Sequence, residues 1–258
     1  MRAAYYTKKG NDAAILHVGR VPEIDPGPDE LQIEIYFSGI NPGEISKGAL
    51  RPGGYMPYPF IIPHSDGAGI VRKTGANVPE SWLGKKVLCF GAQSYRAHGT
   101  AAQYCSIPIS NVIEITDNTP MIQAAQMGIP AMTGYMAVHK AGNLSGKAIL
   151  VQGGAGAVGQ CAIQFAKRAG ALVIATVTRE EDIEKTKKAG ASDVFVLHSG
   201  IISEIKQKYP NGLDHVAEVS FDRNILMDLE LLKNRGSIAT YSSGSGTSHS
   251  LKEFFIRD

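Results

Sequence analysis

Two patterns of apolar residues divide the chain near residue 120. In the first half, the apolar residues form short runs cut by Gly and Pro, which is typical of strands joined by turns. Farther on they recur at helical spacing, and residues 121–142 predict two short helices broken at Pro130. We therefore expect one domain over residues 1–120 and a second over residues 121–258. The strands expected in the first half cover residues 31–40, 66–75, 85–90 and 102–107.

From Ala148 onward, strand patterns alternate with helix patterns. AILVQ and the later apolar runs are continuous, as in parallel strands buried on both faces. Between the first two runs, residues 157–169 carry apolar residues at helical spacing, and Gly170 follows as a left-handed helix cap. This alternation predicts an α/β fold in which a β-rich N-terminal half precedes a doubly wound parallel sheet. The strands expected in this sheet cover residues 148–152, 171–177, 193–197, 212–219 and 236–242.

A glycine-rich turn joins the first of these strands to the helix, in the stretch AILVQGGAGAVGQ. Gly154, Gly156 and Gly159 form the pattern G-x-G-x-x-G between a buried strand and a helix. In this context one glycine makes the turn, one lets the backbone approach a pyrophosphate, and one lets the helix pack on the strand. A helix N-terminus favours phosphate, so the turn predicts a dinucleotide site, and a tight turn without a ligand is the alternative. The candidate contacts are Gly153, Gly154, Ala155, Gly156, Ala157, Val158 and Gly159.

The end of the second strand bears on which dinucleotide is bound. NAD sites commonly place an acidic residue about 20 positions after the glycines, where it binds the ribose 2′-hydroxyl. Here the strand ends in Thr178 and Arg179, and the acids of TVTREED come only after them, in the expected first turn of the next helix. A neutral residue beside an arginine favours a 2′-phosphate, so we expect NADPH, with NADH as the alternative. An arginine that contacts only solvent is nearly as compatible with this pattern.

Composition and charge limit the partners. The 258 residues carry 26 basic and 24 acidic side chains, a formal net charge of +2, without a block of like charge. This balance argues against an extended nucleic-acid or membrane footprint and leaves small molecules as partners. No apolar run reaches the roughly 18 residues of a membrane helix, and the start of the chain lacks the apolar centre of a signal peptide. The three cysteines are widely spaced, so we expect a reduced, cytoplasmic protein.

Three stretches carry a resemblance to a known family: GINPGE, PHSDGAGIV and, before the glycine-rich turn, GYMAV. Together with the β-rich first half, they resemble the medium-chain dehydrogenase/reductase superfamily, and within it the zinc-independent quinone oxidoreductases of the zeta-crystallin type. The resemblance implies an N-terminal GroES-like substrate domain followed by a Rossmann-type dinucleotide-binding domain. In zinc-using relatives the position of Asn41 is a cysteine ligand, and the positions of Ser65 and Asp66 form a His-Glu pair.

The residues of this chain argue against a metal. A catalytic zinc needs three protein ligands of nitrogen, sulfur or carboxylate type, and Asn41 and Ser65 are poor ligands. His64 lies one residue from the ligand position, where a solvated or hydrogen-bonded loop histidine is the simpler interpretation. The four-cysteine lobe of zinc-containing relatives is also missing, because residues 91–104 contain no cysteine. We expect no zinc in the protein.

Without a metal, a bound NADPH suits an acceptor that is already electrophilic, such as a quinone or an α,β-unsaturated carbonyl. The protein then needs to orient the acceptor and to offer hydrogen bonds to the oxygen that gains charge. The resemblance implies Asn41 and, more loosely, Tyr55 as substrate contacts. Asn41 is also suited to closing a turn before Pro42, and Tyr55 to packing on loop prolines. Glu44 is expected to hold the loop.

Further cofactor contacts follow from the resemblance. Thr133 matches a threonine that touches the nicotinamide in relatives, with a helix cap as the alternative. Ser242, Ser243 and Gly244 come directly after the fifth strand of the sheet. Ligands of this fold bind at the carboxyl ends of the strands, so we expect these residues near the cofactor, with an ordinary loop as the alternative.

The end of the chain keeps other functions open. Relatives continue beyond the final stretch LKEFFIRD with a sixth strand and a return segment, so we expect the C-terminal part of the sheet to be missing. Either the chain is a fragment or the protein has lost those parts, and an open sheet edge favours pairing, including a homodimer. The leading prediction is an NADPH-dependent reductase of quinones or enones. An enoyl-thioester reductase and a nucleotide-binding module with little turnover are the alternatives.

Overall fold

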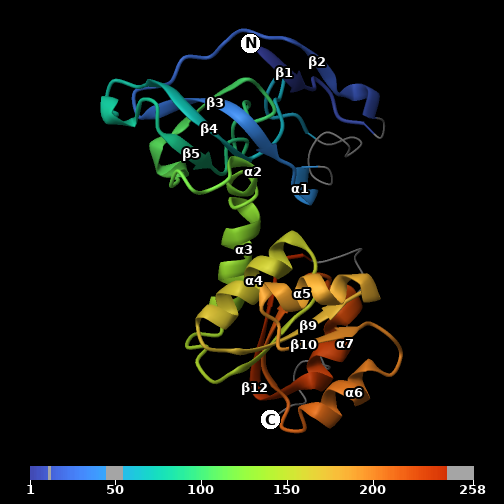
Figure 1. The fold of residues 1–258 in the computed structure, drawn as a ribbon. Coiled ribbons are helices and arrows are strands. Elements are labelled where there is room, and N and C mark those ends of the chain that lie inside the picture. Colours follow the sequence, from blue (N-terminus) through green and yellow to red (C-terminus); the bar gives the residue numbers. More distant parts are fainter. Residues whose placement is uncertain (11–12, 45–54, 243–258) are drawn as a thin grey trace. The chain divides into compact units, whose positions relative to one another are not determined.

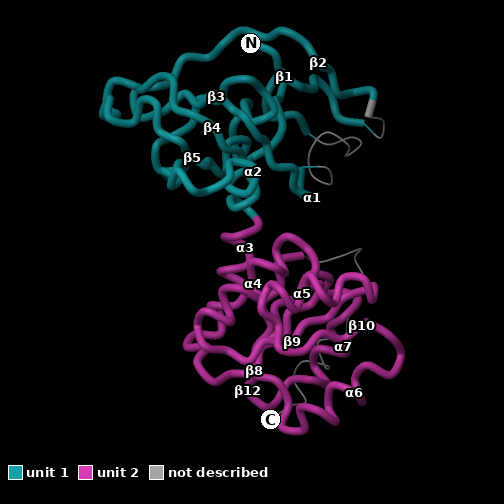
Figure 2. The backbone as a smooth tube through the Cα atoms, in the orientation of Figure 1, with its two compact units in different colours: residues 1–129 teal, residues 130–258 magenta. Residues whose placement is uncertain are grey.

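The structure divides the chain into two compact units. It is a computed structural model that describes residues 1–10, 13–44 and 55–242. Unit 1 runs from Met1 to Ile129 and unit 2 from Pro130 to Asp258 (Figure 2). In the described ranges, none of the helices combines the length and the apolar character that a bilayer-spanning segment needs.

Unit 1 is built on antiparallel strands (Figure 1). A five-stranded sheet has the order β6-β3-β4-β5-β7, and β1 pairs with β2 in a separate ribbon. Alternate residues of β3, such as Leu31 and Ile33, are fully buried in the core of this unit, which explains the short apolar runs of the sequence. β3, β4, β5 and β6 lie where strands were expected, whereas β1, β2 and β7 were not anticipated. The bounds are Arg2–Tyr5 for β1, His17–Arg20 for β2, Glu30–Gly39 for β3, Asp66–Thr74 for β4, Lys86–Cys89 for β5, Tyr104–Pro108 for β6 and Val112–Glu114 for β7.

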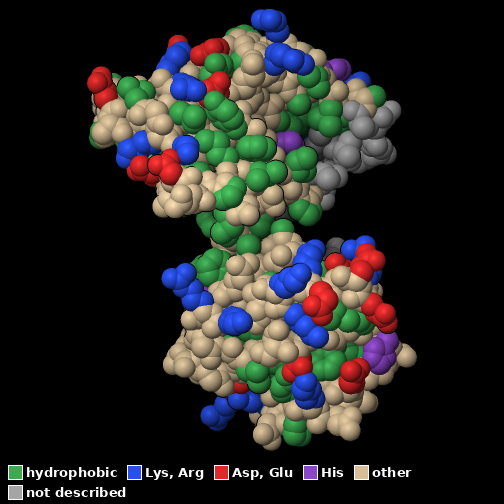
Figure 3. Space-filling view, viewed as in Figure 1, with side chains coloured by type: hydrophobic (Ala, Val, Ile, Leu, Met, Phe, Trp, Pro, Cys, Tyr) green, Lys and Arg blue, Asp and Glu red, His purple; other side chains and the backbone are tan. Residues whose placement is uncertain are grey.

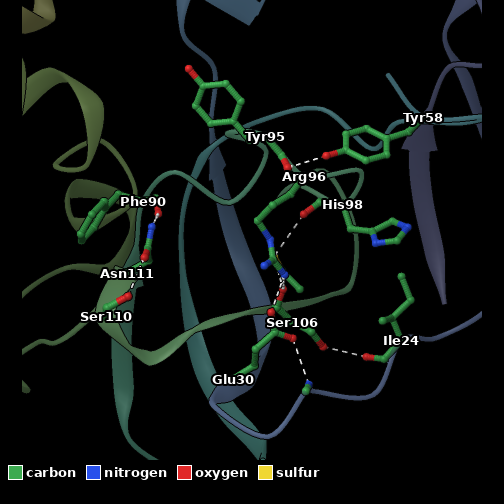
Figure 4. Close-up of polar contacts among 12 residues, drawn as sticks. Ile24, Glu30, Tyr58, Phe90, Tyr95, Arg96, His98, Ser106, Ser110 and Asn111 are labelled. Carbon is green, nitrogen blue, oxygen red and sulfur yellow. Dashed lines mark hydrogen bonds and ion pairs between the residues drawn. The ribbon is translucent and has the colours of Figure 1, made fainter. Parts of the chain in front are cut away.

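Side-chain hydrogen bonds hold the segment between β5 and β6. The Arg96 guanidinium forms an ion pair with Glu30 at 2.6 Å and donates to the Ser106 carbonyl at 3.0 Å (Figure 4). At the start of the segment, the Asn111 amide donates to the Phe90 carbonyl at 3.1 Å. Ordinary polar contacts therefore anchor this segment on the sheet.

Unit 2 contains a five-stranded sheet with the order β10-β9-β8-β11-β12, and all of its strands are parallel. Ile149 and Val151 face one hydrophobic cluster, and Leu150 between them faces another. Both faces of β8 are therefore buried, and the doubly wound sheet that the continuous apolar runs predicted is confirmed. The bounds are Ala148–Val151 for β8, Leu172–Val177 for β9, Asp193–Val196 for β10, Leu213–Glu218 for β11 and Leu232–Thr240 for β12.

Helices connect these strands. α4 was predicted closely, and Gly170 after it has the left-handed φ of +84° expected of a cap. The expected break at Pro130 is also confirmed, because α2 ends before it and α3 has Pro130 in its first turn, where its missing N–H costs nothing. The bounds are Pro42–Glu44 for α1, Met121–Ala124 for α2, Ile129–His139 for α3, Ala157–Arg168 for α4, Ile183–Ala189 for α5, Ile201–Lys208 for α6 and Phe221–Leu231 for α7, with short 3-10 turns at Ala13–Ile15, Glu80–Trp82, Ile109–Asn111 and Glu180–Asp182.

Basic and acidic side chains are interspersed on both units. On the face drawn in Figure 3, blue and red side chains alternate and form no broad area of one sign. This distribution agrees with the near balance of 26 basic and 24 acidic residues in the sequence.

Substitution of Glu30 tests the anchoring of the segment between β5 and β6. Glu30→Gln removes the charge that faces Arg96, whose side chain retains 32% of its exposure, and should lower the free energy of unfolding of unit 1 by about 1–3 kcal/mol. Denaturant titration measures this loss. Asp25→Asn is the matched control, because Asp25 is 80% exposed in its pair with Lys73 and should change the stability by less than about 1 kcal/mol. Equal effects of the two substitutions would contradict the anchoring role.

Candidate functional site

The glycine-rich turn occupies the five residues between β8 and α4. Gly153 has a φ of +66°, a conformation that favours glycine. A Cβ at Gly154 would lie 2.8 Å from the Ala175 side chain, and one at Gly159 would lie 2.3 Å from the Gly153 carbonyl oxygen. At Gly156 an added Cβ would meet only that same oxygen, at 3.3 Å. The packing of the chain therefore demands glycine at positions 154 and 159 far more strongly than at position 156.

The N-terminus of α4 follows this turn directly. Gly156 is the N-cap residue, and no side chain caps the helix. The N–H groups of Ala157, Val158 and Gly159 donate to no other residue in the part of the chain that the structure describes. Unpaired N–H groups and the positive end of a helix dipole form a site for an anion. The turn lies at the carboxyl end of the central strand, between β9 and β11, where the sheet reverses its winding and where ligands of such sheets bind.

Polar side chains that the sequence interpretation missed lie beneath this turn. Gln152 directly follows β8, Thr176 is the last residue but one of β9, and both are fully buried. Thr176 accepts the Gly153 N–H through its hydroxyl at 3.3 Å and the Gly154 N–H through its carbonyl at 2.8 Å. A polar residue at the end of an otherwise apolar buried strand was the available signal, because burial of such a group requires a hydrogen-bond partner.

Thr178 and Arg179 are both exposed at the end of β9. The Arg179 guanidinium, 64% exposed, pairs with Glu181 at 2.8 Å and with Asp182 at 3.0 Å. Its hydrogen bond to Asp182 raises the pKa of Arg179. The acidic residues that follow the strand thus bind the arginine within the same short turn.

The remaining candidate cofactor contacts are placed in part. Thr133 is half-buried in the middle of α3, so it does not cap that helix. The Ser242 carbonyl accepts the Thr240 hydroxyl at 2.9 Å and the Phe221 N–H at 3.3 Å, directly after β12. Ser243 and Gly244 lie outside the described residues.

In unit 1, Asn41 and Asp66 form the centre of a polar cluster. Asn41 follows β3 and is only 8% exposed, and its side-chain N–H₂ donates to Asp66 Oδ2 at 2.9 Å. The second contact of that nitrogen, to Glu44 Oε1, is 3.5 Å long. The Glu44 carboxylate accepts the Asn41 N–H at 2.9 Å and the Ser65 N–H at 2.7 Å, so it fastens the start of the loop to its end.

A chain of hydroxyl groups fixes the tautomer of His64. The Thr100 hydroxyl donates to the Asp66 carbonyl oxygen at 2.6 Å, because a carbonyl can only accept. Thr100 must then accept from the Ser38 hydroxyl at 2.8 Å, and Ser38 must accept from His64 Nδ1 at 2.8 Å. Burial lowers the pKa of His64, so the neutral ring carries its proton on Nδ1 and a lone pair on Nε2. His64 also has a left-handed φ of 74°, which is unusual for a residue with a side chain.

Asp66 is a buried carboxyl group at the start of β4. Burial raises the pKa of Asp66 to about 6, against the hydrogen bonds that Asn41 and the Ile129 N–H donate to Oδ2. Its Oδ1 is buried without a hydrogen-bond partner among the described residues. The ionised form of Asp66 is therefore only partly compensated.

Tyr55, in contrast, is 82% exposed at the edge of the described residues. Cys89 and Cys105 are buried, and burial raises the pKa of both thiols, to about 12 for Cys105. Within residues 1–10, 13–44 and 55–242, no three His, Cys, Asp or Glu side chains come together in a way that could hold a metal ion.

Both units match models of known protein families. Residues 27–117 match the alcohol dehydrogenase GroES-like domain, and residues 157–257 match the zinc-binding dehydrogenase family. The trans-enoyl reductase tazE of Aspergillus terreus is 30% identical, over 90% of this chain and 80% of its own length. This chain therefore belongs to the medium-chain dehydrogenase/reductase superfamily, with the GroES-like and Rossmann-type domains that the sequence motifs implied.

Two further similarities concern quinone oxidoreductases. The quinone oxidoreductase of Pongo abelii is 30% identical over 84% of this chain, and the match spans 66% of that relative, which is just under two thirds of its length. The crystal structure of Escherichia coli quinone oxidoreductase complexed with NADPH superposes with a TM-score of 0.82 at 24% identity, over 98% of this chain and 77% of that one. The second similarity shows that the fold is shared.

Replacement of Asp66 tests the state of this buried carboxyl. Its folded-state pKa of about 6 lies above the value near 3.9 expected after unfolding, so its contribution to stability is complete below pH 4 and is lost as the pH rises through 6. Asp66→Asn, which cannot ionise, should remove this fall and raise the free energy of unfolding at pH 7.5 by on the order of 1–2 kcal/mol relative to the unsubstituted protein.

Denaturant titrations at pH 4.5 and pH 7.5 measure the difference. Asp25→Asn serves as the exposed control and should leave the pH dependence unchanged. A pH dependence that persists in Asp66→Asn would show that another group is responsible.

Proposed function

We propose that this protein binds NADPH, with NADH as the alternative, and transfers a hydride to a quinone or an α,β-unsaturated carbonyl compound. The observation that carries the proposal is the glycine-rich turn at the carboxyl edge of a doubly wound sheet. The helix N-terminus after it has N–H groups without a partner among the described residues. The residues proposed to hold the diphosphate are Gly153, Gly154, Ala155, Gly156, Ala157, Val158 and Gly159.

Gly156 gives independent support for a ligand. Packing within the protein gives only a weak reason for glycine at position 156, because a Cβ there would approach a single carbonyl oxygen, at 3.3 Å. A pyrophosphate that approaches the backbone closely supplies the missing reason for glycine. The exposed helix N-terminus lies directly after this residue.

The preference for NADPH rests on the end of β9. Thr178 occupies the position at which a carboxylate would bind a ribose 2′-hydroxyl, and the neighbouring Arg179 is exposed and suited to a 2′-phosphate. Arg179 pairs at present with Glu181 and Asp182, so a 2′-phosphate must compete with these two carboxylates for the guanidinium. We further propose Thr133, Ser242, Ser243 and Gly244 as cofactor contacts.

On the substrate side we propose Asn41 and Tyr55. Bound NADPH supplies the hydride, and the chain orients the acceptor and hydrogen-bonds its oxygen. One N–H of the Asn41 amide is committed to Asp66, and the other, at 3.5 Å from Glu44, is held weakly enough to be offered to an acceptor oxygen. The quinone oxidoreductases among the relatives support this class of substrate.

We propose that the reaction proceeds without zinc. The amide of Asn41 and the hydroxyl of Ser65 are weak donors for this metal. The thiols of Cys89 and Cys105 are buried, and their raised pKa values disfavour the thiolate that binds zinc.

A second candidate is an enoyl-thioester reductase. The trans-enoyl reductase tazE, 30% identical over 80% of its length, favours it. An enoyl-thioester reductase, like a quinone or enone reductase, transfers a hydride to an electrophilic double bond. In its substrate a thioester activates that double bond. The two candidates therefore differ in the acceptor and share the cofactor site.

The decisive experiment mixes the purified chain with NADPH, and separately with NADH, and follows the absorbance of the reduced nicotinamide after addition of a simple quinone, an enone or an enoyl thioester. Oxidation with the quinone or the enone is the expected result. Faster oxidation with the thioester would favour the second candidate. Cofactor binding without oxidation would overturn both proposed activities. If neither NADPH nor NADH binds, the proposed cofactor site is wrong.

Gly156→Ala is the matching variant. A methyl group at this position should weaken NADPH binding at least about tenfold because it blocks the approach of the diphosphate, while the fold is preserved. Fluorescence titration measures affinity, and circular dichroism measures folding. Gly27→Ala, whose Cβ would have the Glu30 side chain as its nearest neighbour at 3.4 Å, is the control and should bind NADPH normally.

Arg179→Ala tests the choice between the cofactors. The variant should bind NADPH about tenfold more weakly and NADH as before, because only NADPH carries the 2′-phosphate that the guanidinium binds. The dissociation constants of both cofactors measure this difference. Arg168→Ala, at an exposed position late in α4, should alter neither. An equal loss for both cofactors in Arg179→Ala would show that the arginine does not recognise the phosphate.

A further inference from the structure

Four polar side chains lie fully buried beneath the glycine-rich turn. Gln152, Thr176 and Glu218 end or follow three neighbouring parallel strands, β8, β9 and β11, and Asp228 comes from α7. Each of the four has a relative exposure of 0%. Burial of polar groups costs free energy unless they hydrogen-bond one another, so this cluster needs a connected arrangement.

A chain of hydrogen bonds connects the turn to the cluster, and in each bond the group nearer the turn is the donor. The Gly153 N–H donates to Thr176 Oγ1 at 3.3 Å, and the Thr176 hydroxyl donates in turn to Gln152 Oε1. With its oxygen engaged by Thr176, Gln152 presents its nitrogen to Asp228, and Nε2 donates to Oδ1 at 2.7 Å. The path therefore runs from the backbone of the turn through two side chains to the Asp228 carboxyl.

The other end of the path is a pair of carboxyl groups. Glu218 accepts from the Ser220 N–H and from the Asn224 amide, which lies 3.0 Å from Oε1 and 3.2 Å from Oε2. Asp228 Oδ2 has no N–H or O–H donor among the described residues, yet the Asp228 carboxyl lies within hydrogen-bond reach of Glu218. Two carboxyl groups can form a hydrogen bond only when one of them carries a proton.

The surroundings place that proton on Asp228. Ser220 and Asn224 donate to Glu218 and favour its anion, whereas Gln152 is the only donor to Asp228 among the described residues. Burial and the adjacent Glu218 raise the pKa of Asp228 to about 9. Tyr241, after β12, faces Glu218 as well, and burial and that charge raise the pKa of its hydroxyl. Asp222 is the other buried acid of α7.

We propose that Asp228 is a positioning residue that keeps its proton and, through Gln152 and Thr176, holds the glycine-rich turn in the conformation that binds the dinucleotide. This inference rests on the proposed cofactor site. Loss of the proton to the solvent leaves two adjacent buried carboxylates, and their repulsion displaces Asp228 from Gln152. Thr176 then loses its fixed acceptor, the Gly153 N–H loses its alignment, and the affinity for the dinucleotide falls.

NADPH titrations of the full chain from pH 7 to pH 10, followed by nicotinamide fluorescence, test the inference. The unsubstituted protein should lose about tenfold in affinity between pH 8 and pH 10, because only the protonated form positions the turn and its apparent pKa is about 9. Asp228→Asn cannot ionise and should bind with unchanged affinity across this range. Identical pH dependences of the two proteins would overturn the positioning role.

Three further variants separate positioning from general destabilisation. Glu230→Gln, at an exposed position of the same helix, should keep the pH dependence of the unsubstituted protein. Thr176→Val removes the hydroxyl in the middle of the path and should weaken NADPH binding at pH 7 about tenfold, whereas Thr176→Ser restores it. Normal binding by Thr176→Val would overturn the proposed path.

An infrared measurement tests the proton without the cofactor. At pH 8, where Asp66 is ionised, the protein should show the C=O stretch of a buried protonated carboxyl group, and this band should disappear in Asp228→Asn. Absence of the band overturns the shared proton even if NADPH binds. Presence of the band in a protein that does not bind NADPH at any pH would instead overturn the proposed cofactor site, and with it the positioning role.

Discussion

Unit 2 depends on a steric constraint between a strand and the helix that follows it. A Cβ at Gly159 would lie 2.3 Å from the Gly153 carbonyl oxygen, so α4 can start this close to β8 only when position 159 is glycine. The close approach brings the first turn of α4 to the carboxyl edge of the sheet, where its first N–H groups have no partner in the described part of the chain. The same contact that allows the helix to pack therefore creates the anion-binding character of the turn.

Buried polar groups support this turn from below. Thr176 and Gln152 are polar residues at the carboxyl edge of two apolar core strands, and Thr176 hydrogen-bonds both Gln152 and the backbone of the turn. Glu218 and Asp228 extend the arrangement into α7. A core made only of apolar residues would leave the Gly153 N–H without a partner, so the polar cluster and the conformation of the turn belong together.

In unit 1, polar side chains likewise hold a loop through hydrogen bonds to its backbone. Glu44 binds two backbone N–H groups that are far apart in the sequence, and Asp66 receives hydrogen bonds from Asn41 and from the backbone of Ile129. Hydrogen bonds from N–H groups to the carboxylates of Glu44 and Asp66 hold the loop here. Burial raises the pKa of Asp66, and one oxygen of its carboxyl is buried without a hydrogen-bond partner among the described residues.

The sequence by itself determined the elements whose signals are local. The apolar runs gave the five parallel strands, the 3.6-residue period gave α4, and the glycines gave the turn and the cap at Gly170, because each depends on neighbours within a few positions. Only the tertiary structure decided the pairing of the short strands β1 and β7, the tautomer of His64, and the meeting of Gln152 with Asp228 across 76 positions. These features depend on contacts between distant segments, and a single sequence carries no periodic pattern for such contacts.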